Sequence, residues 1–411
     1  MIPYDAPARA AYPLRFRQAE ARNRRLGIPL RLLARLDTPD PALLERIGER
    51  LLHRDEPAAR LVAAMRIRDG SDPNRVTMTQ FRQALEAGIE TLPVVPEPLQ
   101  EFFDLVDRVP EWVDFELLDE GAAVYRRFGA NAADVLLQLA LIGSYRFGGP
   151  TDLLVATGAL TGGTTIRRLA ETQEWAIAIA RPNAMRRNGR GFQLTIHVRV
   201  MHALVNQRFE TNGRWDTAMW GLPVNQSDQA ATLGLFSGAL LLGVRALGVR
   251  VTRGESRAVM HLWKYVGWLI GVDEDWLCDT ESAQHRLNYH HLITQGDISA
   301  AGPLLANAVV DAQTELHYGT HPHLSGHFAR ERLLSMLGYF LRRQGMHELQ
   351  LPYRPPWAAA ATIAANIARY QTLSRSGLGR DQLERWGERS TRRLLRRYFS
   401  DDIPDVGQLR L

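Results

Sequence analysis

The segment "TIHVRVMHALVNQRF" (residues 195–209) decides the fold, because its apolar residues recur at helical spacing between a few polar ones. At about 100° per residue, Arg199 and His202 lie about 60° apart on this predicted helix, and Asn206 lies about 40° beyond His202. His197 points about 140° away from His202. The two histidines therefore cannot easily bind one ion together, and His202 would act alone on its face of the helix.

His202 has two interpretations. A single histidine with an arginine one turn before it suits a haem iron, with Arg199 near a haem propionate. The alternative is a core histidine whose ring is hydrogen-bonded to a backbone carbonyl. The helix taken alone favours this structural alternative, because a motif of two residues has little specificity. Other parts of the chain must decide between the two.

Composition indicates an ordinary globular protein with no basic surface for nucleic acid. The 411 residues are 45% hydrophobic and 23% charged, with a formal net charge of +5. Only Lys264 is lysine among the 50 basic residues, and the 45 acidic residues are mixed among them. Short basic runs such as "STRRLLRRYF" (390–399) contain leucines and are typical of one face of an amphipathic helix. We therefore expect no nucleic-acid partner.

The sequence predicts a cytoplasmic protein without a membrane span. A single cysteine, Cys278, excludes an intrachain disulfide framework. The first 20 residues lack the apolar core of a signal peptide, and the arginine pair in "NRRLGIPLRLLARL" (23–36) begins a predicted helix. The longest apolar run, residues 230–244, has 15 residues, fewer than the roughly 20 that cross a bilayer. A buried helix is the better interpretation of this run.

Helical periodicity runs through nearly the whole chain, and strand-like alternation is nearly absent. We predict an all-α fold, a single large helical domain with extra helices at both ends. Residues 1–95 would form an N-terminal cap, 96–300 the core, and 301–411 a C-terminal layer. Helices are expected near 41–54, 79–92, 116–128, 131–145, 151–159, 165–180, 227–247, 255–270, 273–286, 299–315, 326–344, 358–374 and 380–398, besides the helix of His202 and a short one within 93–114.

A polar trio precedes the His202 helix. In "TGALTGGTTIRRLAETQEW" (157–175), Arg168, Glu171 and Thr172 are spaced i, i+3 and i+4 and share one helix face. The simplest interpretation is a solvated face with an internal Arg168–Glu171 pair. However, two helices joined by a turn can face each other across a gap, and His202 follows the trio by about 30 residues. The trio would then form the distal side and His202 the proximal side of a haem site.

Other histidine-rich segments carry little chemistry by pattern alone. "HYGTHPHLSGH" (317–327) is predicted to be a loop, because Gly319, Pro322 and Gly326 interrupt it, and it contains no acidic residue. "HRLNYHH" (285–291) lacks the histidine–glutamate pair of a zinc protease. The sequence also has no glycine-rich phosphate loop and no Gly-x-Ser-x-Gly elbow. The His202 helix and the polar trio are the remaining candidates.

Five segments in order resemble the rubber oxygenase (latex clearing protein) family and related MpaB-type haem oxygenases, among them a fungal membrane-associated oxygenase. These segments are "VPEWVDFELLDEGAAVYRRFG" (109–129), "LLVATGAL" with "RRLAET" (153–172), "RVMHALV" (199–205), "GLPVNQSDQAATLGLFS" (221–237) and "LWKYVGWLIGVDEDWL" (262–277). The resemblance covers roughly residues 105–300. It implies a helical fold with a globin-like core, a b-type haem, and an oxygenase that uses dioxygen.

The resemblance also implies roles for individual residues. His202 would be the proximal iron ligand and Arg199 a haem-site arginine, while Arg168 and Thr172 would lie on the distal side and could donate hydrogen bonds to dioxygen. Two positions depart from the latex-clearing pattern: Glu171 replaces a lysine, and Asn206 replaces a second arginine. Glu171 is then a candidate proton shuttle. These departures argue against rubber as the substrate more than they argue against haem.

The sequence therefore predicts a haem b oxygenase that acts on a small apolar molecule. The predicted catalytic residues are Glu171, Arg168 and Thr172. The predicted haem-binding residues are His202, Arg199 and Arg168. Its substrate and electron donor are not identified by the sequence. Two alternatives stay open: a haem-binding sensor or carrier without turnover, and a haem-free helical scaffold.

Overall fold

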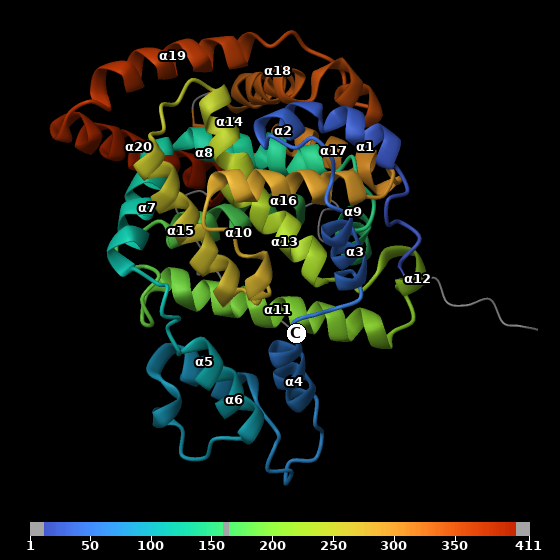
Figure 1. The fold of residues 1–411 in the computed structure, drawn as a ribbon. Helices are drawn as coiled ribbons and strands as arrows, with labels where there is room; N and C mark the ends of the chain where they lie inside the picture. The colour runs from blue at the N-terminus through green and yellow to red at the C-terminus, as the bar shows by residue number, and fades with distance from the viewer. Residues whose placement is uncertain (1–11, 159–163, 320, 400–411) are drawn as a thin grey trace, which may run out of the picture.

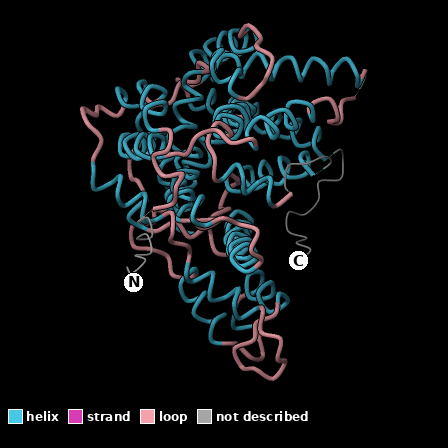
Figure 2. The backbone as a smooth tube through the Cα atoms, turned by 90° about the vertical axis from the view of Figure 1, so that its right-hand side faces the viewer, coloured by secondary structure: helices cyan, strands magenta, loops and turns pink. Residues whose placement is uncertain are grey.

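The computed structural model describes residues 12–158, 164–319 and 321–399, and within these ranges the regular structure is entirely helical (Figures 1 and 2). The predicted all-α fold class is confirmed. The elements are α1(Glu20–Leu26), α2(Ile28–Leu33), α3(Pro41–Arg50), α4(Glu56–Met65), α5(Met78–Ala87), η1(Ile89–Thr91), α6(Glu97–Val106), α7(Phe115–Phe128), α8(Ala130–Val135), η2(Leu136–Ile142), α9(Pro150–Ala156), α10(Thr164–Ile179), α11(Arg190–Thr211), α12(Thr217–Trp220), α13(Gln226–Gly234), η3(Leu235–Ala239), α14(Leu240–Ala246), α15(Arg253–Leu269), η4(Glu274–Trp276), α16(Glu281–Thr294), α17(Ala301–Ala312), α18(Pro322–Glu348), α19(Trp357–Leu373) and α20(Gly377–Phe399).

One apolar core connects all three predicted segments of the chain. Its buried residues run from Ile47 in α3 to Leu383 in α20 and include Phe102 and Trp263. A second cluster joins the amino-terminal half of α10 to α17 and α18. Burial of apolar side chains from every part of the chain supports one large domain. The proposed boundaries near residues 95 and 300 and the globin-like arrangement stay predictions.

The helix α11 separates two parts of the molecule (Figure 1). Helices α4, α5 and α6 lie on one side of it, and α4 and α5 pack against it. On its other side lie α10 and α15, which also contact α11, followed by α16 and then α18 and α19 at the far end. The helix that carries His202 is therefore covered from several directions by elements distant in sequence.

Two predicted helices contain π-helical segments. The helix expected over 131–145 is α8 followed by η2, and the one over 227–247 consists of α13, η3 and α14. The two π segments contact each other. A π segment adds a residue to a helical turn and re-aims the side chains after it, and such segments are frequent at functional sites. The periodicity of the sequence does not distinguish these insertions from a continuous α-helix.

The apolar stretch Gln226–Ala246 is the one helical span in the described ranges that is long and apolar enough to cross a membrane. More than half of its most apolar window, 56%, is buried inside the molecule. Core helices of soluble proteins meet the same length and composition criteria, so the stretch is weak evidence for a span. Its burial agrees with the sequence-based interpretation of 230–244 as a core helix.

Two sequence predictions of local structure were wrong. The helix expected over 273–286 is a short 3-10 turn, η4, and α16 starts only at Glu281, where the Thr280 side chain caps the helix by accepting from the Ala283 amide. The segment 317–327 is not a loop throughout, because α18 begins at Pro322. Proline at the first helical position favours a helix start, since its fixed φ suits the helix and its missing N–H is not needed there. Residues 159–163, where the sequence leaves a gap between the helices expected over 151–159 and 165–180, lie outside the described residues.

Candidate functional site

Helices α10 and α11 form a hairpin whose register relates the polar trio to His202. Gly191 packs against α10 so closely that a methyl group there would lie 2.9 Å from the Ile179 Cα atom. One turn further from the connection, Trp175 Nε1 donates a hydrogen bond to Thr195 Oγ1 at 3.1 Å. Each turn back along α10 therefore corresponds to a turn forward along α11. Extended as straight helices for about two more turns, this register would bring Arg168 level with His202.

The polar trio lies on the solvent-accessible side of α10. Arg168 and Thr172 are exposed, and the Thr172 hydroxyl donates to the Arg168 backbone carbonyl. Glu171 is 35% exposed at its side chain and pairs with Arg167 at 2.9 Å, so the internal Arg168–Glu171 pair considered from sequence is not formed. The opposite side of this half of α10 is buried, with Leu169 in the cluster of α17 and α18. The distal role of the trio stays a prediction.

Arg199 is buried, and its guanidinium already has protein partners. It forms a two-bond ion pair with Asp55, at 2.6 Å from Nε to Oδ2 and 2.9 Å from Nη2 to Oδ1. Nη1 donates to the Leu269 carbonyl, and the guanidinium lies 5.5 Å from the centre of the Phe102 ring. Gly271, with φ of +90°, allows the close approach of this pair, because a methyl group there would meet the Asp55 carboxylate. These contacts tie α11 to α4 and α15, and the propionate role of Arg199 stays a prediction.

His202 lies in the second half of α11 and is partly buried. Its Nδ1 atom is fully buried and has no hydrogen-bond partner among the described residues. Burial lowers the pKa of His202, and the Gln229 side chain and the Asp55 carboxylate oppose this effect in part. Burial therefore favours the neutral form of the ring, which is the form that binds metals.

His197 faces a different environment, as the helical spacing predicts. Burial and the positive charges of Arg82 and Arg190 lower the pKa of His197 to about 4. Arg82 lies in α5, which packs against α11, and Arg190 is the first residue of α11. His197 and His202 thus occupy separate faces, and His197 is a matched control for any substitution of His202.

Asn206, which replaces an arginine of the latex-clearing pattern, has a structural role. Its Nδ2 donates to the Val224 carbonyl at 2.8 Å, and its Oδ1 accepts from the Val224 amide at 2.6 Å. These two hydrogen bonds hold the turn before α13 against α11. Asn225 then caps α13 by accepting from the Asp228 amide at 2.9 Å.

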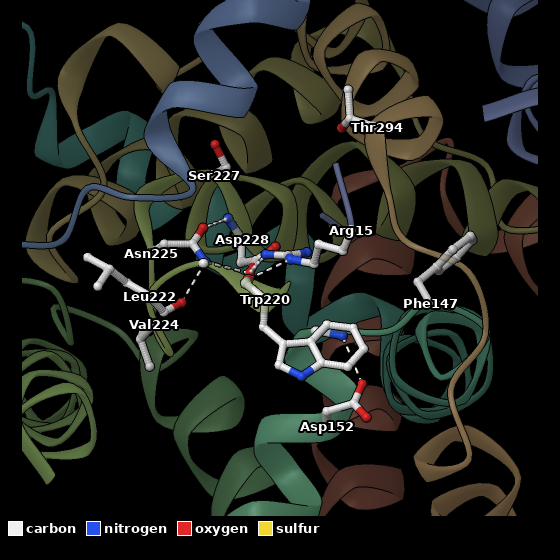
Figure 3. A network of polar contacts seen from close by, with 12 residues as sticks. Arg15, Phe147, Asp152, Trp220, Leu222, Val224, Asn225, Ser227, Asp228 and Thr294 are labelled. Carbon is white, nitrogen blue, oxygen red and sulfur yellow. Dashed lines mark hydrogen bonds and ion pairs between the residues drawn. The ribbon is translucent and has the colours of Figure 1, made fainter. Parts of the chain in front are cut away.

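A buried ion pair anchors the same turn (Figure 3). Arg15, which is 1% exposed, donates to Asp228 Oδ2 at 2.5 Å and to the Trp220 carbonyl at 2.7 Å. Asn225 Nδ2 also donates to Asp228, at 2.7 Å. Gly149 lies so close that a methyl group there would be 2.8 Å from the Arg15 guanidinium. Arg15 thus connects the amino-terminal segment to α13 through Asp228, and its guanidinium also packs against the start of α9.

The other histidines do not form a metal site. Within the described ranges, no group of three or more histidine, cysteine, aspartate or glutamate side chains could hold a metal ion. His290 in α16 uses both ring nitrogens, accepting from the Asp40 amide and contacting the Arg286 carbonyl. His291 is 3% exposed, lies 5.5 Å from the Trp276 ring, and has no partner in this part of the molecule for either nitrogen. His291 is therefore the second control for His202.

Two residues of this site were missed by sequence reasoning. Asp55 directly follows the helix predicted over 41–54, and in the structure its side chain both caps α4 and pairs with Arg199. Gln229 belongs to the polar run "NQSDQ" (225–229), which precedes an apolar stretch and is buried throughout. Five consecutive polar residues at the start of an otherwise apolar helix were a signal that those side chains bind something inside the protein.

The fold resembles that of a protein of known structure, latex clearing protein. The structure of latex clearing protein in the closed state matches 86% of this chain and 95% of its own chain, with a TM-score of 0.62 and 20% sequence identity. At this identity the similarity establishes the fold alone.

The family follows from the sequence match. Residues 126–399, more than half of the chain, match the family described as ER-bound oxygenase mpaB/B'/rubber oxygenase, catalytic domain, and the chain belongs to this family. It is 23% identical over 268 residues to the rubber oxygenase of Streptomyces sp. (strain K30), covering 63% of this chain and 62% of that relative. The matched segment is thus less than two thirds of the relative's length. The family resemblance seen in the sequence is confirmed, and it extends beyond residue 300 into the helices that cover α10.

Proposed function

We propose that this chain is a haem-dependent oxygenase in which His202 binds the iron of a b-type haem. The observation that carries the proposal is the environment of His202: a partly buried imidazole on a helix held from several sides, whose buried Nδ1 has no partner among the described residues and whose burial favours the neutral form. Membership of the family adds the oxygenase chemistry.

The residues present fit a haem better than a free metal ion. A protein metal site needs three or four ligands, and the described residues offer no such group. A haem needs only one protein ligand, because the porphyrin supplies four nitrogens. When bound, the haem would supply the iron that activates dioxygen.

The remaining roles belong to side chains of α10 and α11. Arg168, level with His202 in the hairpin register, and the Thr172 hydroxyl would orient dioxygen or substrate by donating hydrogen bonds. Glu171 would release Arg167 and move a proton to or from the reacting oxygen. Arg199 would hold α11 in place through its ion pair with Asp55.

The substrate proposed is a small apolar molecule that enters the cell or is made there. Family membership supports an apolar, polyisoprene-type class of substrate. Glu171 in place of lysine and Asn206 in place of arginine are the reasons for separating this chain from rubber-cleaving members. A cytoplasmic location, suggested by the single cysteine, belongs to the same proposal.

The test is haem content after substitution of single histidines. We expect the wild-type chain, His197→Ala and His291→Ala to retain about one extractable haem per chain, and His202→Ala to lose it with an unchanged helical circular dichroism signal. Haem kept by His202→Ala and lost from either control would contradict the assignment. Oxygen uptake and product analysis with apolar test compounds then separate an oxygenase from a haem carrier or sensor, which would bind haem without turnover.

A further inference from the structure

The first turn of α13 is a row of buried polar side chains, and one of them is incompletely bonded. Gln226 donates to the Gly271 carbonyl and accepts from the Asp273 amide, and Ser227 donates to the Ile47 carbonyl. Asp228 is paired with Arg15 (Figure 3). Gln229, 8% exposed, differs from these because its Oε1 atom is fully buried and has no partner among the described residues.

The imidazole of His202 is a complementary group that interacts with the Gln229 side chain. The Gln229 side chain acts on His202 by hydrogen bonding, and His202 Nδ1 is itself fully buried with no other partner in the described ranges. An amide oxygen can only accept a hydrogen bond, whereas Nδ1 can donate one only when it carries the proton. A hydrogen bond between these two atoms would satisfy both of them at once, and buried polar atoms are costly to leave unpaired.

We infer that Gln229 is the positioning residue of His202: its Oε1 accepts a hydrogen bond from His202 Nδ1–H and leaves the Nε2 lone pair free for the iron. The inference rests on the proposed function, since only a ligand histidine needs this tautomer. Metal-binding histidines generally donate their second N–H to an oxygen acceptor, which fixes both the proton and the ring orientation.

The structure holds Gln229 firmly enough for this role. The turn that carries it is anchored to the amino-terminal segment by the Arg15–Asp228 pair and to α11 by the bonds of Asn206 to Val224. The first turn of α13 is also fixed to the segment after α15 by Gln226. These anchors set the position of Gln229 relative to α11 without contribution from a haem.

The test replaces the acceptor in two ways and includes a matched glutamine. Gln229→Met keeps the volume but removes the acceptor, whereas Gln229→Glu keeps an acceptor and adds negative charge. Gln138→Met is the control, because Gln138 in η2 is 1% exposed and also has a buried Oε1 without a partner among the described residues. The readouts are the haem dissociation constant and the haem reduction potential, measured by titration of the purified full-length chain with hemin and by spectroelectrochemistry.

We expect Gln229→Met to weaken haem binding by about 10–100-fold relative to wild type and Gln138→Met. We expect Gln229→Glu to retain haem with a lower reduction potential, since a carboxylate gives the ligand imidazole more anionic character. Wild-type affinity in Gln229→Met, or haem loss in Gln229→Glu equal to that in Gln229→Met, would overturn the inference. A wild-type chain that binds no haem would instead refute the proposed function.

Discussion

Substitution of Asp55 tests whether Arg199 holds the fold or serves the haem. Asp55 and Arg199 side chains are 10% and 5% exposed, and they share two hydrogen bonds between α4 and α11. Asp55→Asn keeps the size of the side chain but removes its charge and one of the two oxygens that accept from Arg199, so the buried guanidinium loses its counter-charge. Breaking one partner of a buried ion pair costs about 3–5 kcal/mol, because the remaining charge is buried without compensation.

The assay is urea unfolding followed by circular dichroism, with and without added hemin. We expect Asp55→Asn to lower the apparent free energy of unfolding by about 3–5 kcal/mol in both conditions. The control is Glu101→Gln, which removes an exposed pair with Arg60 (59% and 53% exposed side chains) and should cost less than about 1 kcal/mol. The double variant Asp55→Asn/Arg199→Met should recover part of the loss, because the uncompensated charge is removed.

Two results would refute this reasoning. A loss in Asp55→Asn no larger than that in Glu101→Gln would mean that the buried pair does not hold α11. A loss confined to the hemin-bound protein would assign Arg199 to the haem, as the sequence pattern predicted.

Three further predictions concern the distal side, acid stability and substrate. Glu171→Ala should keep haem but slow oxygen-dependent turnover by about 10²–10⁴-fold, whereas Arg167→Ala should keep both haem and turnover. A loss below about tenfold in steady-state oxygen uptake would limit the role of Glu171 to its ion pair with Arg167. Burial alone would raise the pKa of Glu281, but hydrogen bonds from His285, Arg245 and Ser256 hold that pKa at about 2. The contribution of Glu281 to stability is therefore present above about pH 4.5 and is lost as the pH falls towards 2. Glu281→Gln should flatten the dependence of stability on pH in this window, and an unchanged slope in acid unfolding curves would contradict the assignment. Polyisoprene should be a poor substrate, and oxygen uptake with carbonyl products from rubber latex would show that Glu171 and Asn206 do not exclude it.

The helical fold could be predicted because the apolar period is strong in most helices. The expected helix over 116–128 is α7 at Phe115–Phe128, and the one over 358–374 is α19 at Trp357–Leu373. Errors arose where local chemistry overrides the period, as at Pro322, which starts a helix within a segment that reads as a loop. The π segments η2 and η3 could not be foreseen, because an added residue in one turn leaves the apolar content unchanged.

The site could be predicted in part. Helical spacing separates His202 from His197, and the structure gives the two residues different surroundings. The partner of Arg199 could not be predicted, because Asp55 lies 144 positions earlier in the chain and pairs through tertiary packing. The bonds of Asn206 to Val224 likewise depend on the path of the loop after α11, which the local sequence does not specify.

The visible absorption spectrum of the full-length protein, purified from cells supplied with iron, tests the central claim most directly. The account predicts a Soret band whose intensity corresponds to about one haem per chain and which disappears in His202→Ala. A wild-type protein that is correctly folded, colourless, and unchanged in spectrum by added hemin would contradict it.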